Sequence, residues 1–173
     1  MRRLNATAAS LLGLLHDGPL TGWDLVATAQ ERIGNFWTLT QSQVYRELAR
    51  MTDDGLVTVG EPGPRDRKPY TITEAGRTAF AEWIDAAPAA DQVRVPLLLT
   101  IQFSTHLRPG RLAEIIDAAR AEHTARLAAY REHEAHLATD ADHVRLATLR
   151  FGIRHEEAAL AWFDELPGLL GTD

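Results

Sequence analysis

The first half of the chain combines short helical patterns of apolar residues with strong turn signals. Apolar residues recur at helical spacing in three stretches, which end at Asp17-Gly18-Pro19, at Gly34-Asn35 and at Asp54-Gly55. Thr21 and Thr40 are each followed three residues later by a polar side chain that suits a helix N-terminus. The pattern therefore predicts three helices, which end near residues 16, 32 and 53.

The period then changes from helical to extended. Leu56–Val59 and Tyr70–Thr73 are short β-branched runs, and a basic stretch rich in Gly and Pro separates them. This pattern predicts a hairpin with a long tip, after which Thr73 caps a fourth helix that runs to about Ala86. Three helices, a hairpin and a helix are the layout of a winged helix-turn-helix, so we expect that fold over residues 1–86, with a two-stranded wing.

The second half of the chain is predicted to be helical throughout, so the fold class is mainly α. Residues 87–93 have the composition of a linker, and helices are expected over about 95–106, 109–137 and 143–165. Pro109 suits the first turn of its helix, and Pro167 is expected to lie beyond the last one. The last helix has one apolar stripe of Leu146, Leu149, Ile153, Leu160 and Phe163, and another of Val144, Thr148, Phe151, His155, Ala158 and Trp162.

A helix with two apolar faces needs a partner for each face. The 109–137 helix is the expected partner within the chain. A second copy of the protein, related by a two-fold axis, is the expected partner for the other face. The alternative is that this helical arm folds back onto the N-terminal domain. We therefore predict that residues 94–170 form a helical dimerisation domain in a homodimer.

Composition and charge exclude several classes of function. The chain of 173 residues has no cysteine and a net charge of -6, and neither half is basic as a whole. No apolar run is long enough to span a bilayer, so we expect no membrane association and a cytoplasmic location. Phosphate-loop and serine-hydrolase motifs are absent, and His133 and His136 alone are a weak metal motif. The sequence predicts no enzyme, no cofactor and no metal site.

Two local features favour nucleic-acid binding despite the acidic total. On the third helix, Val44, Leu48 and Met51 share one face, and the opposite face is polar. Arginine and glutamine can pair with base edges, and small residues let the backbone approach a major groove. The same pattern also fits an ordinary solvated helix face. The candidate DNA-contacting residues on this helix are Ser42, Gln43, Tyr45, Arg46 and Arg50.

The hairpin tip is the second local feature. Arg65, Arg67 and Lys68 lie within four residues, and a winged fold places this tip beside the third helix. We expect these cations to contact the phosphate backbone on either side of a groove contact. A flexible loop whose charges only serve solubility is the alternative, and Asp66 between the arginines counts slightly against binding. The two features together favour double-stranded DNA as the partner.

Several stretches resemble one family, the PadR-type transcriptional regulators. The N-terminal segments are ASLLGLLHDGPLTGWDL, WTLTQSQVYRELARMTDDGLVT and YTITEAGR, and Trp23 stands where that family usually has tyrosine. RVPLLLTIQFSTHLRPGRLAEII and EEAALAWFDEL resemble the family's C-terminal helical region. The resemblance implies a dimeric, repressor-like regulator that binds a palindromic operator. It also implies control by a small effector in many members, frequently an aromatic or phenolic compound.

His155 lies on a stripe that is otherwise mostly apolar, with Phe151 and Trp162 nearby. An imidazole beside two aromatic rings could hydrogen-bond a phenol or a carboxylate, so these three residues are the candidate effector site. A core histidine satisfied by a neighbouring group is the alternative. At the level of function, the alternative to a DNA-binding regulator is a winged-helix protein-interaction module that does not bind DNA.

Overall fold

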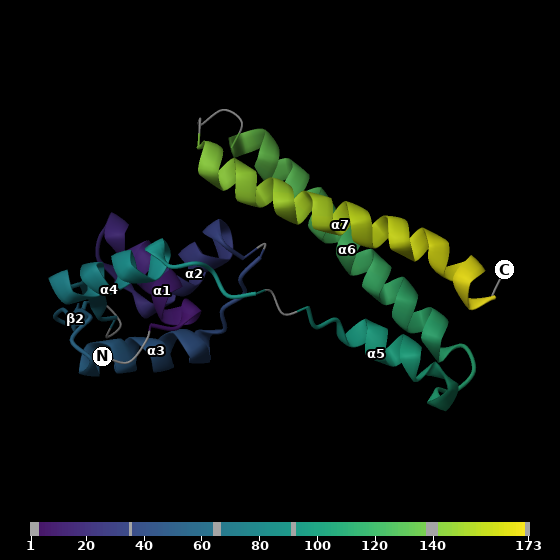
Figure 1. The fold of residues 1–173 in the computed structure, drawn as a ribbon, viewed down its shortest axis with the longest axis horizontal. Helices are drawn as coiled ribbons and strands as arrows, with labels where there is room; N and C mark the ends of the chain where they lie inside the picture. The colour runs from purple at the N-terminus through teal and green to yellow at the C-terminus, as the bar shows by residue number, and fades with distance from the viewer. Residues whose placement is uncertain (1–3, 35, 64–66, 91–92, 138–141, 172–173) are drawn as a thin grey trace. The chain divides into compact units, whose positions relative to one another are not determined.

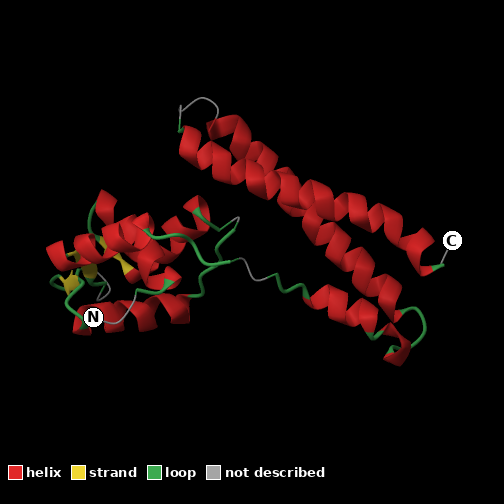
Figure 2. Ribbon diagram, viewed as in Figure 1, coloured by secondary structure: helices red, strands yellow, loops and turns green. Residues whose placement is uncertain are grey.

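The computed structural model describes residues 4–34, 36–63, 67–90, 93–137 and 142–171. The chain divides into two compact units, residues 1–90 and residues 91–173. Figure 1 shows both as ribbons, and each is described separately below. Every described strand belongs to the first unit, and the second is built from helices and their connections (Figure 2).

Three of the four helices of the first unit begin where the sequence predicts. Thr21 caps the second and Thr40 the third, and in both cases the residue three positions later completes a capping box. Thr73 caps the fourth by accepting a hydrogen bond from the Gly76 amide at 3.0 Å. The four helices are α1 (Ala6–Leu14), α2 (Gly22–Arg32), α3 (Gln41–Asp53) and α4 (Glu74–Asp85), and a 3-10 turn, η1 (Leu15–Asp17), follows α1.

The predicted hairpin is present, and a third strand extends it. β2 (Val57–Val59) pairs antiparallel with β3 (Pro69–Ile72), with Val57 opposite Ile72. β1 (Leu20–Thr21) pairs with the other edge of β3, so the strand order is β1-β3-β2. The predicted wing had only two strands, because a run of two residues such as β1 carries no strand signal. The short third strand joins the wing to the start of α2.

The core of the first unit is formed by the apolar faces of α1, α2 and α3. Leu11, Leu25, Val44 and Leu48 have no exposed surface at all. Leu56, Val57 and Ile72 belong to the same cluster, so the wing strands share the core of the helices. Burial of this size stabilises the fold by roughly 1.5–3 kcal/mol for each large side chain. The position of α3 is therefore fixed by its buried face, which leaves the opposite face free.

The second unit is a pair of long helices preceded by a short one. The pair is α6 (Arg111–Leu137) and α7 (His143–Leu170), and the short helix is α5 (Pro96–Gln102), followed by the 3-10 turn η3 (Ser104–His106). Leu149 and Ile153 of α7 pack with Leu127 and Leu137 of α6. The stripe that includes Leu149 and Ile153 is therefore the one that packs on α6.

A buried carboxylate also joins the two long helices. Glu156 of α7 is only 4% exposed, and His123 Nδ1 and Arg126 Nε of α6 both contact it, the latter at 3.2 Å. A buried carboxylate is tolerated only with such partners. The Phe163 ring lies 5.4 Å from the His123 ring, so aromatic packing continues the contact.

Three predicted helix boundaries in the second unit were wrong. The helix expected over 95–106 is interrupted at Phe103, where the backbone leaves helical geometry. Pro109 is not in the first turn of α6, because Gly110 has a left-handed φ of 78° and the helix begins after it. α7 does not stop before Pro167 but continues to Leu170, where Gly171 caps it with a φ of 65°. Phe163 and Leu166 are buried in this last part.

No helix among the described residues is long and apolar enough to cross a membrane.

Candidate nucleic-acid interface

The outward face of α3 begins at a tightly capped N-terminus. Gln43 Oε1 accepts a hydrogen bond from the Thr40 amide at 2.9 Å, and Thr40 Oγ1 accepts one from the Gln43 amide at 3.3 Å. The Ser42 hydroxyl lies 3.2 Å from Thr40 Oγ1. Two candidate DNA-contacting residues, Ser42 and Gln43, are thus positioned by the cap. Capping restrains the first turn, which is the part of a recognition helix that reaches base edges.

Tyr45 and Arg46 lie on the exposed face of α3, one turn further along. Both side chains are exposed, and no ion pair joins Arg46 to any residue in the described ranges. Its guanidinium is therefore available to a phosphate or a base. Val44 and Leu48, the neighbours on the opposite face, are fully buried.

Arg50 occupies a different environment from Arg46. It forms an ion pair with Glu47, and its side chain is 30% exposed. Glu47 is itself buried, and it accepts a hydrogen bond from Asn5 Nδ2 at 3.3 Å. Asn5 is also the N-cap of α1, so this network connects the start of α1 to the middle of α3. Arg50 contributes a cation near the exposed face, but it also neutralises a buried carboxylate.

The described part of the wing places Arg67 and Lys68 directly before β3, and both are exposed. Backbone hydrogen bonds continue the hairpin beyond the strands, from the Gly60 amide to Pro69 at 2.8 Å and from the Gly63 amide to Arg67 at 2.8 Å. The third predicted cation, Arg65, lies outside the described residues. Arg67 and Lys68 are therefore held on an ordered arm of the wing.

Trp23 connects the wing to the outward face of α3. The Arg67 guanidinium lies over the Trp23 ring, 5.6 Å from its centroid, in cation–π geometry. Beside Trp23, the Tyr45 ring packs so closely on Gly22 that a Cβ there would lie 2.6 Å from a ring carbon. Tyr45 of α3, the first turn of α2 and Arg67 of the wing thus form one continuous surface.

Trp23 is part of this surface, although it is not among the site residues predicted from the sequence. Its side chain is 54% exposed, so it does not belong to the core of the first unit. The sequence places this large aromatic residue in the first turn of α2, two positions after the N-cap Thr21. Only the pairing of β1 with β3 shows that the wing lies beside it.

Tyr70 supports this surface from within. Burial, and to a smaller extent the neighbouring Tyr45, raises the pKa of the Tyr70 hydroxyl above its ordinary value. The hydroxyl therefore remains protonated and uncharged at neutral pH. Tyr70 pairs with Leu20 of β1 and Val59 of β2, so it lies at the centre of the sheet that carries the wing.

The candidate effector residues do not form an enclosed pocket within one chain. Phe151 is 66% exposed and His155 is also exposed, whereas Trp162 is partly buried with its ring 5.1 Å from that of Phe163. All three lie on α7. They belong to the apolar stripe that α6 does not cover.

The winged helix-turn-helix carries an exposed polar helix face that is continuous with a basic wing. These features define the class of this protein as a DNA-binding regulator. Two family models match the chain: the Transcriptional regulator PadR-like family over residues 11–82, and the Virulence activator alpha C-term family over residues 93–170. A probable transcriptional regulator of Mycobacterium tuberculosis is 30% identical over 166 residues, which cover 84% of this chain and 87% of that protein. The chain belongs to the PadR-like family, as its sequence motifs predicted.

Three further comparisons agree with this assignment. The negative transcriptional regulator PadR of Bacillus subtilis is 24% identical over 95% of this chain and 97% of its own length. Its crystal structure with operator DNA has a TM-score of 0.80 at 22% identity, covering 96% of this chain and 98% of that one. The structure of the same regulator with p-coumaric acid has a TM-score of 0.72 at 24% identity and covers 96% and 99% of the two chains. The prediction of a mainly α winged-helix fold is confirmed, and the protein is a DNA-binding transcriptional regulator.

Proposed function

We propose that this regulator binds a palindromic operator as a homodimer and represses transcription from it, in the cytoplasm. The observation that carries the proposal is the continuous surface from Tyr45 and Arg46 through Trp23 to Arg67. The name of the Bacillus subtilis relative, a negative regulator, supports repression as the direction of control.

In this proposal each part of the surface has its own role. α3 enters the major groove, where Ser42, Gln43 and Arg46 contact base edges or the nearest phosphates. Arg65, Arg67 and Lys68 of the wing contact the flanking backbone, which fixes the register but reads no sequence. Tyr45 and Arg50 contact DNA at the edge of the helix. The ion pair of Arg50 with Glu47 reduces the contribution of Arg50 to DNA binding.

Exposed apolar side chains in the second unit support the homodimer. α5 has no buried residue, and Leu99 is 64% exposed. On α7, Val144 and Phe151 lie on the stripe that faces away from α6. Apolar surface of this kind favours burial against another chain. A second copy with the same surface would cover both helices in an isologous contact.

We also propose that a small aromatic effector releases the operator, with Phe151, His155 and Trp162 at its site. The support is the structure of the Bacillus subtilis relative with p-coumaric acid, together with the aromatic stripe on α7. Since Phe151 and His155 are exposed in the single chain, a pocket at these residues requires the second copy to enclose the compound.

The proposal is tested by selecting bound fragments from genomic DNA and measuring affinity for the selected sequence by fluorescence anisotropy. We expect a palindromic site, two chains per duplex and an affinity that falls steeply with salt, because each phosphate contact releases counterions. A screen of aromatic compounds for release of the bound fragment then tests the effector. A protein with no salt-sensitive affinity even for random duplex DNA would instead be a protein-interaction module.

A further inference from the structure

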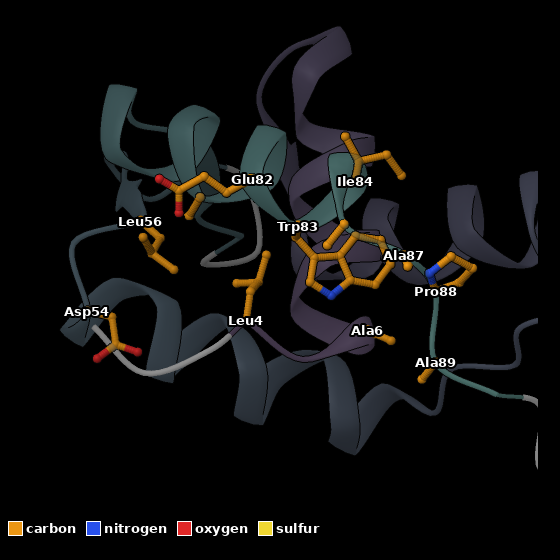
Figure 3. Close-up of a pocket in the computed structure, with 12 residues that line it drawn as sticks. Leu4, Ala6, Asp54, Leu56, Glu82, Trp83, Ile84, Ala87, Pro88 and Ala89 are labelled. Carbon is orange, nitrogen blue, oxygen red and sulfur yellow. The ribbon is translucent and has the colours of Figure 1, made fainter.

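The first unit contains a cavity that is separate from the DNA-facing surface. Its volume is about 930 Å³, at the upper end of the range for small-molecule sites. It lies between the start of α1, the end of α3 and the last turn of α4 (Figure 3). Its apolar walls come from Leu4, Leu56, Trp83, Ile84 and Pro88. Figure 3 shows the Trp83 ring directed into the space between α4 and the segment that begins at Leu4.

Among the described residues that line this cavity, the charged side chains are acidic. Asp54 and Glu82 line it at the end where Leu56 lies, and no basic side chain is among the described lining residues. Both carboxylates are exposed, and neither forms an ion pair with a residue in the described ranges. A ligand with an apolar body and a positive charge would meet the apolar walls and the carboxylates together. An indole face such as that of Trp83 adds a favourable cation–π contact.

We propose that this cavity binds a lipophilic organic cation. Charge complementarity selects this class, because an aromatic carboxylate of the same size would be repelled by Asp54 and Glu82. The cavity therefore differs in chemistry from an effector site for phenolic acids. It also lies in the first unit, whereas Phe151, His155 and Trp162 lie in the second.

The walls of the cavity connect a bound cation to the operator-binding elements. Asp54 is the C-cap of α3, and its amide donates a hydrogen bond to the Arg50 carbonyl at 2.9 Å. Leu56 leads directly into β2, and its carbonyl accepts hydrogen bonds from the Thr73 amide at 3.0 Å and from the Thr73 hydroxyl. A ligand that contacts Asp54 and Leu56 thus touches the end of α3 and the base of the wing. On the proposed DNA-binding role, ligand and operator affinities are coupled reciprocally.

Tetraphenylphosphonium and tetraphenylborate provide the test, because they have the same shape and opposite charges. Isothermal titration of the full-length protein without DNA is expected to show saturable binding of the cation, at least tenfold tighter than binding of the anion. The Asp54→Asn/Glu82→Gln variant should lose at least tenfold in affinity for the cation. The Asp53→Asn/Asp85→Asn variant changes the net charge equally at two neighbouring positions outside the cavity, and it should bind the cation as the parent does.

Several results would overturn the proposal. Equal affinity for both ions would exclude charge selection, and unchanged cation affinity in the Asp54→Asn/Glu82→Gln variant would exclude this cavity. Cation affinity that falls as the protein concentration rises would identify a second copy as the occupant. Anisotropy with operator DNA tests the coupling separately: we expect a change of at least threefold in operator affinity with saturating cation. Cation binding without that change would support the ligand site and exclude its regulatory role.

Discussion

At the scale of single residues, the two arginines of α3 differ in what they are free to do. Arg46 has no ion pair with a described residue and projects from the exposed face. Arg50, one turn later, is paired with the buried Glu47. From their spacing in the sequence, both are expected to be outward-facing cations. Their different environments predict that mutation of Arg46 lowers operator affinity and that mutation of Arg50 lowers stability.

Arg46→Ala is expected to weaken operator binding by about 1–3 kcal/mol and to relax discrimination at one base position, because a guanidinium contact is lost. Stability should be unchanged, since the side chain is solvated. Anisotropy titrations against the operator and single-base variants measure the effect. Arg77→Ala, which removes an exposed arginine from α4, is the matched control. An Arg46→Ala protein with full affinity for every sequence would exclude base contact by this residue.

Arg50→Ala is expected to lower the free energy of unfolding by about 1–3 kcal/mol, because it leaves the buried Glu47 without its cation. Urea denaturation followed by circular dichroism measures the change. The double variant Glu47→Gln/Arg50→Ala should recover part of the loss, since no unpaired charge remains. If Arg50→Ala were as stable as the parent, the ion pair would have no structural role.

At the scale of elements, the wing is expected to act through charge alone. Replacing Arg65, Arg67 and Lys68 together by alanine should weaken binding to operator and to random duplex DNA by similar factors. The slope of log affinity against log salt should fall by about 3 if all three contact phosphate, since each contact contributes about 0.9. Salt titrations on both duplexes measure this. A slope equal to that of the parent would show that the tip does not contact DNA.

Pro167 lies inside the last turns of α7, where it lacks the amide hydrogen that a helix uses. Pro167→Ala is therefore expected to raise the free energy of unfolding by about 1–3 kcal/mol. The urea midpoint of the full-length protein measures it. Glu165→Ala, at an exposed neighbouring position, should shift stability by less than about 0.5 kcal/mol. A destabilised Pro167→Ala protein would mean that the proline ring itself packs against something essential.

Local signals allowed much of this element order to be predicted, and tertiary contacts account for the rest. The Thr40 and Gln43 capping box is complete within four residues, so α3 could be placed from sequence. The buried Glu47 accepts a hydrogen bond from Asn5, 42 positions away, and β1 exists only because Leu20 pairs with Tyr70. The contact between Trp23 and Arg67 depends on that same pairing. Such contacts leave no local periodicity, so the sequence predicted the exposed face of α3 but not the surface that joins it to the wing.

At the scale of the whole molecule, operator binding depends on the second unit if the regulator is a dimer. Phe151→Glu places a charge on the uncovered stripe of α7, and it should convert the dimer to a monomer in light-scattering measurements. Operator affinity should then fall by at least 100-fold, because two half-sites are no longer bound by one linked particle. Phe151→Leu keeps the face apolar and should remain dimeric. A Phe151→Glu protein that stays dimeric would place the interface elsewhere.

The buried residues form two separate clusters, one drawn entirely from the first unit and one entirely from the second. We expect the energetic effects of substitutions in different clusters to add, because each cluster is packed within its own unit. This separation bears on how such a regulator can diversify. Mutations that reshape the helical pair leave the core that holds α3 unchanged, so operator recognition and the proposed effector response can change separately.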